Sequence, residues 1–450
     1  MAFRSLREME IELVAMTSSL FFGDIPCDEE SQLRDELQRE FLKKDMVGNM
    51  TSGGTESLLL MMKTYRDYFT NNYDSFIQSM KRKYNKVNDD KSQPFEVIVP
   101  STIHPAVNKG AHYFGLKLVE VPVDPFTMAV TPEAVQKAFN PGRTILIIAS
   151  APSYPHGVMD PIEKLAQLAV KLGPVGLHVD SCIGGYVIPF VDRLNKQSPN
   201  EEQLDPFDFR LLGVTSLSAD LHKYGYGCKG ASVLLFRNES IRENQFFVYG
   251  GWSGGLYVSP AILGSKGGGP IASSYASVKL LGIEGFMNVT EKMARVRKTI
   301  QNAIETDPVL SRYLTIVGKP CSTIMSFTTK QALREYYESK SVQYTKGRVE
   351  TLSIFAISDR MEKKYGWDLQ RQMKPDCLHM TLMPQHIGLE NQIISDLIES
   401  VNYVKDHPDE FAGKNSVAMY GMVANVSNWL SEDVVELFLT IFVGEVYRLR

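Results

Sequence analysis

Six short runs rich in β-forming residues recur between residues 95 and 237, and they constrain the fold more than any other feature. Several, such as TILIIAS at 144–150, lack polar alternation, which is typical of strands buried on both faces of a sheet. Helical patterns lie between some of them, as at 159–173. Strands that alternate with helices predict a mainly parallel sheet flanked by helices, an α/β fold. The six predicted strands span 95–100, 115–123, 144–150, 176–181, 214–220 and 231–237.

Local patterns divide the chain into three predicted parts. Residues 1–48 form an N-terminal helical segment, in which an amphipathic helix precedes a solvated one. Residues 49–288 form a large domain that carries the predicted sheet and contains a glycine-rich loop at 249–276. Beyond this loop glycines become sparse and helical patterns return, with one strand at 323–329. Residues 289–450 are therefore predicted to form a smaller C-terminal α+β domain.

Composition narrows the class of protein. The chain has 450 residues, of which 44% are hydrophobic and 22% charged, as is ordinary for a soluble globular enzyme. A net charge of -4 argues against a general nucleic-acid or anionic-membrane surface. Charges run through the first half of the N-terminal helix, so we expect neither a signal peptide nor a membrane span there. These features predict a soluble, cytoplasmic protein.

The cysteines are few, odd in number and widely scattered. This pattern favours reduced thiols over a disulfide framework. The sequence contains no CxxC pair and no HExxH motif, so we expect no metal site. The five cysteines are Cys27, Cys182, Cys228, Cys321 and Cys377.

The stretch TSGGTES at 51–57 is the first candidate for chemistry. Gly53 and Gly54 let the backbone approach a ligand, and Thr55 begins an apolar helical pattern. Exposed N–H groups and the helix dipole at such a position favour a phosphate. A plain turn with a capping threonine is the alternative interpretation.

Two charged residues follow predicted strands further along the chain. Asp180 ends the run GLHVD, where it either caps the next helix or faces a cationic ligand group. Lys223 follows VTSLSAD and is flanked by His222 and Tyr224, in surroundings better suited to a packed site than to a solvated surface. Ligands of parallel α/β sheets gather at the carboxyl ends of strands, so all of these residues are expected at one edge.

One cofactor accounts for the glycine turn, the aspartate and the lysine together. Pyridoxal phosphate needs a lysine for its Schiff base and a carboxylate that keeps its ring nitrogen protonated. It also needs an anion site for its phosphate group. The combination predicts an aminotransferase-like fold that binds pyridoxal phosphate.

Longer segments closely resemble the sphingosine-1-phosphate lyase family. That family belongs to the fold type I, pyridoxal-phosphate-dependent group that also includes the glutamate and aromatic amino-acid decarboxylases. The resemblance runs from about residue 3 nearly to the C-terminus, and the HKYGYxxK pattern separates the lyases from the decarboxylases. The segments are TSGGTES, HVDSCIGGY, DPFDFRLLGVTSLSADLHKYGYGCKG, YGGWSGGLYVSPAILGS and AMYGMVANVS at 418–427.

The resemblance assigns roles to particular residues. It implies that Lys223 binds the cofactor covalently, that Asp180 pairs with its ring nitrogen and that His104 stacks on the ring face. Lys229 is similar to a second family lysine that contacts the substrate phosphate or assists proton transfer, whereas a plain surface lysine is the alternative. In a homodimer, Ser265 is expected to complete the phosphate site of the partner subunit. The resemblance also implies that Gly53, Gly54, Thr55 and His222 hold the cofactor phosphate.

The activity implied by the resemblance is a carbon–carbon lyase reaction. A retro-aldol cleavage would convert a phosphorylated sphingoid base into a long-chain aldehyde and phosphoethanolamine. Two alternatives are an amino-acid decarboxylase, which would need a carboxylate-binding arginine in the pocket, and a non-catalytic homologue that only binds the cofactor. The second alternative arises because family members are expected to carry a substrate-contacting arm upstream of the REMEIELVAMTSSLF helix, with which this sequence begins. The segment at 24–48 is also longer than expected, and Lys266 and Gly267 stand where the family favours arginine and proline.

Overall fold

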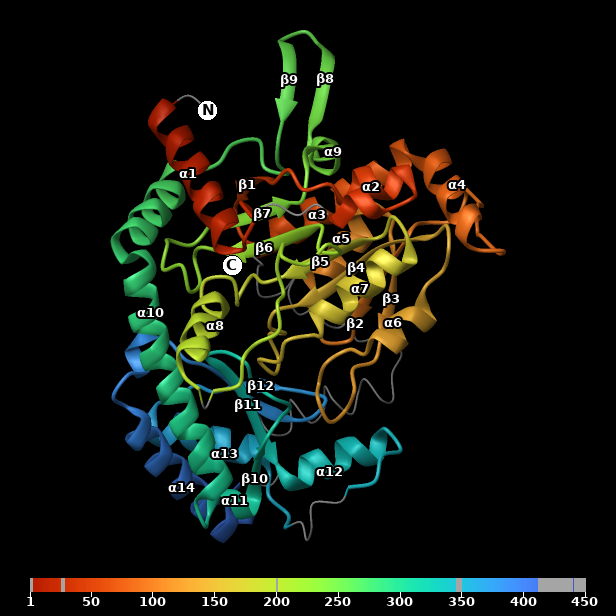
Figure 1. The fold of residues 1–450 in the computed structure, drawn as a ribbon. Coiled ribbons are helices and arrows are strands. Elements are labelled where there is room, and N and C mark those ends of the chain that lie inside the picture. The colour runs from red at the N-terminus through yellow and green to blue at the C-terminus, as the bar shows by residue number, and fades with distance from the viewer. Residues whose placement is uncertain (1–2, 26–28, 200, 345–349, 412–439, 441–450) are drawn as a thin grey trace. The chain divides into compact units, whose positions relative to one another are not determined.

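The computed structural model describes residues 3–25, 29–199, 201–344, 350–411 and 440 (Figure 1). Cys27 and the segment at 418–427 lie outside these residues. The described part forms two compact units. Unit 1 contains the described residues of Met1–Arg295, Gly318–Met325 and Leu382–Gln385, and unit 2 those of Val296–Val317, Ser326–Thr381 and His386–Arg450. The division of the chain at residues 48 and 288 stays a prediction.

A seven-stranded sheet forms the centre of unit 1 in the described residues, with the order β1-β7-β6-β5-β4-β2-β3. All six predicted strands are confirmed, and β2 to β6 run parallel to one another. Every residue of β2, β4, β5, β6 and β7 is buried, which explains why their sequences lack polar alternation. The strands are β2 (Glu96–Pro100), β3 (Lys117–Val121), β4 (Thr144–Ser150), β5 (Gly176–Asp180), β6 (Ser216–Asp220) and β7 (Ser232–Phe236).

One edge of the sheet departs from the parallel pattern. Strand β7 pairs antiparallel with β6, and β1 (Val47–Thr51) pairs antiparallel with β7. The sequence analysis missed β1 because VGNMT contains a glycine and an asparagine and has no apolar run. Because β1 is antiparallel to β7 and β7 is antiparallel to β6, β1 runs in the same direction as β6. The carboxyl end of β1 therefore lies at the same edge as the carboxyl ends of the parallel strands.

Helices cover the sheet of unit 1, and their apolar side chains complete one core (Figure 1). The solvated helix predicted within residues 24–48 is shorter than expected and buries Phe41 and Leu42. Gly282 interrupts α10 with a φ of 54°. The helices are α1 (Arg4–Leu20), η1 (Glu29–Gln32), α2 (Glu36–Leu42), α3 (Gly54–Asn71), α4 (Tyr73–Lys83), α5 (Ala106–Phe114), α6 (Pro132–Ala138), α7 (Ile162–Leu172), α8 (Ile188–Gln197), α9 (Glu239–Arg242), η2 (Glu243–Gln245) and the start of α10 (Gly268–Thr306).

The prediction of a glycine-rich loop at 249–276 is wrong over much of its length. Strands β8 (Phe247–Trp252) and β9 (Gly255–Ser259) form a hairpin that projects from the rest of unit 1 (Figure 1), and α10 begins at Gly268. The sequence analysis missed these strands because glycines interrupt them. An exposed two-stranded hairpin also lacks the buried apolar run by which a central strand is recognised. Its side chains are largely exposed, apart from the buried Ser259.

Unit 2 contains more β-structure than the single predicted strand. The predicted strand at 323–329 is present as β11, within a four-stranded sheet of the described residues in the order β10-β11-β13-β12. The other three strands have three to five residues each, too short for a clear sequence pattern. The elements with most of their residues in unit 2 are α11 (Leu310–Tyr313), β10 (Leu314–Ile316), β11 (Ile324–Thr329), α12 (Lys330–Ser339), α13 (Ile354–Arg360), η3 (Met361–Tyr365), β12 (Gln370–Gln372), β13 (Cys377–Thr381), α14 (Glu390–Asp406) and α15 (Pro408–Phe411). The short η4 (Pro384–His386) belongs mostly to unit 1.

A buried histidine links two central strands beneath the carboxyl edge. The Nδ1 of His178 on β5 lies 2.8 Å from Ser216 Oγ, and its Nε2 lies 3.1 Å from Ser218 Oγ, both on β6. The hydroxyl of Tyr65 donates a 2.9 Å hydrogen bond to Ser216. Burial lowers the pKa of His178 to about 4, so the ring is neutral at physiological pH and both nitrogens have partners.

We predict that His178 makes folding sensitive to acid. The unfolded chain takes up a proton near pH 6.5 and the folded chain only near pH 4, so acid favours unfolding between these values. The free energy of unfolding of the parent should fall by up to about 1.4 kcal/mol per pH unit relative to that of His178→Gln, which has no titrating ring. Urea unfolding at several pH values measures this difference.

Only the difference between the two proteins tests this prediction. Burial raises the pKa of Asp160 to about 6, so this carboxyl titrates in the same window in both proteins and cancels in the comparison. A parent-minus-variant difference that stays constant from pH 7 to pH 4 would contradict the prediction.

Candidate active site

Two aspartates meet where neighbouring parallel strands end. Asp180 is the last residue of β5 and Asp220 the last residue of β6, and they are 8% and 2% exposed. Both line a cavity of about 640 Å³ in unit 1. The parallel arrangement brings strand ends from distant parts of the chain to one edge, as the sequence analysis expected.

The N-terminus of helix α3 forms another wall of this cavity. Gly53 has a φ of 144°, which disfavours any residue with a side chain, and Gly54 is the first residue of the helix. Both glycines and Thr55 line the cavity. Glu56 fixes this turn, since its carboxylate accepts hydrogen bonds from the backbone N–H of Ser52 at 2.6 Å and of Leu263 at 3.0 Å. The start of an 18-residue helix therefore faces the cavity.

Lys223 lies opposite in a strongly acidic environment. Its Nζ is 3.0 Å from Asp220 Oδ2 and lines the same cavity as Asp180. Burial alone would lower the pKa of Lys223, but the negative charge of Asp220 outweighs it and raises that pKa above its usual range. The amine is therefore an ammonium ion held by a carboxylate in the structure.

Two histidines and a second lysine reach the cavity from two loops, one after β2 and one between β6 and β7. Exposed His104 lies beyond the end of β2, and its Nδ1 accepts a 3.1 Å hydrogen bond from the backbone N–H of Ala106, which leaves Nε2 for other partners. His222 places Nε2 3.6 Å from Asp220 Oδ2. Lys229 is exposed at the cavity and has no ion partner among the described residues.

Ser265 is the predicted site residue that does not line this cavity. It is exposed and contacts a separate hollow of about 50 Å³, which Ser52, Gly230 and Leu263 also line. The structure thus brings together Gly53, Gly54, Thr55, His104, Asp180, His222, Lys223 and Lys229, whereas Ser265 lies beside them.

The cavity residues that the sequence analysis did not single out include Asp220, Cys182 and Tyr154. Asp220 was taken as the end of a strand, although its position three residues before Lys223 was a usable signal. Cys182 lies 3.3 Å from Ser218 Oγ, and burial raises the pKa of its thiol, so the sulfur is uncharged. Tyr154 follows the apolar run of β4, and burial raises the pKa of its hydroxyl. No pattern in the sequence marks Cys182 or Tyr154 as a cavity residue.

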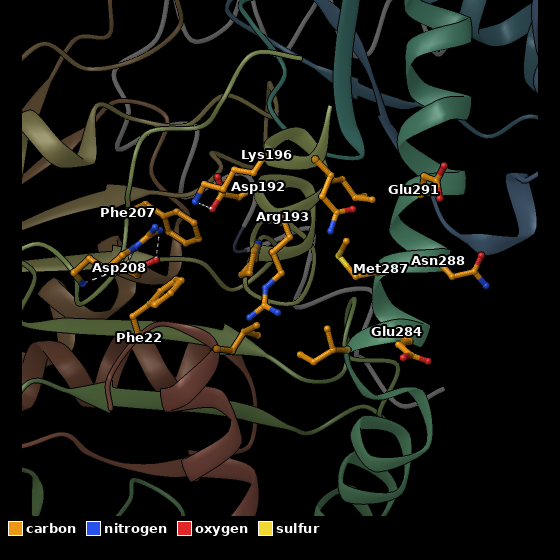
Figure 2. Close-up of a pocket in the computed structure, with 16 residues that line it drawn as sticks. Phe22, Asp192, Arg193, Lys196, Phe207, Asp208, Glu284, Met287, Asn288 and Glu291 are labelled. Atoms are coloured by element: carbon orange, nitrogen blue, oxygen red, sulfur yellow. Dashed lines mark hydrogen bonds and ion pairs between the residues drawn. The ribbon is translucent and has the colours of Figure 1, made fainter. Parts of the chain in front are cut away.

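A larger cavity of about 800 Å³ lies elsewhere in unit 1, between α8, α10 and the end of α1 (Figure 2). Its lining contains two ion pairs, Lys196 with Asp192 and Arg210 with Asp208, each at 2.7 Å. None of the predicted site residues lines it. The smaller cavity at the sheet edge is therefore the candidate active site.

Comparisons with known proteins identify the family to which this arrangement belongs. The parallel sheet with its site at the carboxyl edge is typical of fold type I enzymes. The pyridoxal-dependent decarboxylase conserved domain matches residues 35–330. A sphingosine-1-phosphate lyase of Dictyostelium discoideum is 32% identical over 99% of this chain and 70% of its own length. The solved structure of a Burkholderia pseudomallei sphingosine-1-phosphate lyase matches with a TM-score of 0.72 and 31% identity, over 94% of this chain and 81% of that one.

The chain therefore belongs to the sphingosine-1-phosphate lyase branch of the pyridoxal-dependent decarboxylase family. It spans just under two thirds of some relatives: a rice lyase, 36% identical over 91% of this chain, is covered over 64% of its length. Within the described ranges, no helix is long and apolar enough to cross a membrane.

The family implies pyridoxal phosphate as the cofactor, and the cavity residues fit it. An aldehyde group can bind the Lys223 amine, a protonated ring nitrogen matches the buried Asp180 carboxylate, and a phosphate matches the α3 N-terminus. A Cβ at Gly54 would lie 2.8 Å from Cys182 Sγ and 2.9 Å from Asp220 Oδ2, so the chain leaves no room for a side chain there. The described residues contain no cluster of three or more metal-ligating side chains.

Gly54→Ala should disturb both folding and cofactor binding. The added methyl group has to displace buried Cys182 and Asp220, which should lower the free energy of unfolding by about 1–3 kcal/mol. Urea unfolding and a titration with pyridoxal phosphate measure the two effects. Gly269→Ala is the matched control, since a Cβ there meets nothing within 4 Å. Parent-like stability and cofactor affinity in Gly54→Ala would contradict the packing argument.

Proposed function

We propose that the chain is a carbon–carbon lyase that depends on pyridoxal phosphate and cleaves phosphorylated sphingoid bases to a long-chain aldehyde and phosphoethanolamine. The observation that carries this proposal is the single cavity that joins Lys223, buried Asp180 and the glycine-lined start of α3. Family membership supports the substrate class, because the matched relatives are sphingosine-1-phosphate lyases.

Lys223 would hold the cofactor covalently until the substrate amine displaces it, and the cofactor would supply the electron sink for the carbon–carbon bond that breaks. Asp180 would keep a positive charge on the ring nitrogen opposite it, because a buried carboxylate favours a cationic neighbour. Backbone N–H groups at Gly54 and Thr55, together with His222, would hold the phosphate group.

The remaining cavity residues would orient the substrate. His104 has Nε2 available and would cover the ring face. Lys229 carries an ammonium group without a described ion partner, so it is suited to bind the substrate phosphate. Buried side chains such as Cys182 line the cavity and would exclude water from the reacting carbons.

The composition of the cavity lining disfavours an amino-acid decarboxylase. Such an enzyme needs an arginine or a similar group to bind the substrate carboxylate. The described residues that line the cavity include no arginine, and their lysines are Lys223 and Lys229. If Lys223 binds the cofactor, Lys229 remains as the cation for one anionic group of the substrate, in keeping with a phosphate.

Lys223→Ala provides the main test of the proposed reaction. The parent, supplied with pyridoxal phosphate, should release long-chain aldehyde from a phosphorylated sphingoid base, and the variant should lose roughly 10³-fold or more of that rate. Lys109→Ala changes an exposed lysine on α5 outside the cavity and should keep the parent rate. Coupled detection of the aldehyde measures all three rates.

The other outcomes separate the alternatives. A parent that binds the cofactor but releases no aldehyde would reject the lyase reaction. Carbon dioxide release from an amino acid would then identify a decarboxylase, and no turnover of any amine would identify a non-catalytic cofactor-binding protein.

A homodimer with shared active sites is the proposed assembly. The β8–β9 hairpin exposes a dense apolar surface, with Trp252 55% and Leu256 72% exposed, and exposed apolar patches of this kind mark contact surfaces. The chain continues from the hairpin to Ile262 and Leu263, which line the cavity, and then to exposed Ser265. A second copy seated on the hairpin would lie next to the site, where Ser265 would serve the partner's phosphate group.

Charges on the hairpin should break this dimer. The double variant Trp252→Glu/Leu256→Glu places two carboxylates in the proposed interface, where desolvation and like-charge repulsion oppose association. Light scattering should show a dimeric parent and a monomeric variant. Tyr113→Glu is the control, because this residue on α5 is 59% exposed and lies outside the hairpin. A monomeric parent, or a double variant that stays dimeric, would overturn the proposal.

A further inference from the structure

Asp220 occupies a position that the assignment of Lys223 and Asp180 leaves unexplained. It is 2% exposed, and its Oδ2 forms an ion pair with Lys223 Nζ at 3.0 Å. Its Oδ1 is buried and has no hydrogen-bond partner in the described residues. A buried carboxylate with an incomplete set of partners is unfavourable for folding, so its presence calls for another cause.

The ion pair has a direct consequence for the reactivity of the lysine. A lysine attacks an aldehyde through its neutral amine, and a nearby carboxylate favours the charged ammonium form. The side chain of Lys223 is 35% exposed, so partial burial works in the opposite direction and favours the neutral form. The stronger of these two effects, the charge of Asp220 or the partial burial of the lysine, sets the pH above which the neutral amine of Lys223 reacts.

Asp220 is better placed than the other polar groups of the cavity to control this balance. Lys223 faces Asp180, Cys182, His222 and Tyr154 as well. Asp220 is the carboxylate that forms an ion pair with Lys223 among the described residues. The Cys182 thiol and the Tyr154 hydroxyl are uncharged, because burial raises the pKa of each.

We propose that Asp220 is the positioning residue of the reactive lysine, which its carboxylate holds against the cavity wall as an ammonium ion whenever the lysine is not bound to the cofactor. The proposal rests on the proposed function, in which Lys223 binds the cofactor. Asp220 ends β6 and Lys223 lies three residues later in the following turn, so the pair forms within a single local segment. The lysine therefore returns to the same place and charge each time the substrate amine displaces it.

The test is the pH dependence of Lys223 acylation in the full-length chain after dialysis against hydroxylamine to remove cofactor. A small acylating reagent modifies only neutral amines, and mass spectrometry of the peptide with Lys223 gives the rate. In Asp220→Asn, which keeps the size of the side chain but not its charge, the rate at pH 8 should rise about tenfold or more, since one pKa unit changes the neutral fraction tenfold. An unchanged rate would overturn the proposal.

Asp192→Asn is the matched control. Asp192 is 5% exposed and its Oδ2 pairs with Lys196 at 2.7 Å, but it lines the larger cavity of Figure 2. This variant should leave Lys223 acylation at the parent rate. An equal rise in the rate of Lys223 acylation in both variants would show that the loss of any buried charge loosens the fold. That result would reject a specific role for Asp220.

The parent alone also tests the proposal if Asp220→Asn does not fold. Its Lys223 should acylate half-maximally at or above the ordinary lysine pKa of about 10.4, and a clearly lower value would overturn the ion-pair argument. In the chain loaded with pyridoxal phosphate, the pH midpoint of the visible absorbance should fall by one unit or more in Asp220→Asn. Failure of cofactor attachment would reject the proposed function but leave the acylation test decisive for Asp220.

Discussion

Burial of the central sheet on both faces is the constraint on which the rest of unit 1 depends. Strands such as β4 and β5 have no exposed residue, so any polar side chain inside them needs an internal partner. His178 meets this condition through Ser216 and Ser218 on the neighbouring strand. In the strands that are buried throughout, charged residues occupy only the terminal positions, and the parallel direction collects the carboxyl ends at one edge. The position of the site is therefore a consequence of how the sheet is packed.

The Asp220 carboxylate couples two walls of this site that are far apart in sequence. On one side it pairs with Lys223, and on the other its Oδ2 approaches the start of α3 so closely that Gly54 has no room for a Cβ. A shift of Asp220 would move the lysine and the helix terminus together. In the proposed function, this one buried side chain would hold the phosphate-binding end and the aldehyde-binding end of the cofactor site in register, which would explain why a carboxylate with incomplete hydrogen bonding is retained there.

The sequence predicted the central strands because buried parallel strands are apolar throughout. It singled out Asp180 because that residue ends such a strand, and Lys223 because it follows one closely. It did not predict β1 or the β8–β9 hairpin, since glycines and polar residues interrupt both segments. Strand β1 is stabilised by pairing with β7, and β8 and β9 are stabilised by pairing with each other. A sequence pattern does not show which segments pair. Asp220 was missed although its spacing of three residues from Lys223 was a usable signal, because the spacing alone does not show that the carboxylate contacts the lysine.

The two lysines of the loop between β6 and β7 show how environment separates identical side chains. Lys223 lies against a buried carboxylate that fixes its place and charge, as a group that must repeatedly meet one carbon atom requires. Lys229, six residues later, is exposed and has no described ion partner, so its charge remains available to an anion from solution. Under the proposed roles, exchanging their surroundings would leave the nucleophile mobile and would neutralise the lysine that binds the substrate phosphate. In this proposal the aspartate at the end of β6, rather than the lysines themselves, decides which of the two is held for covalent chemistry.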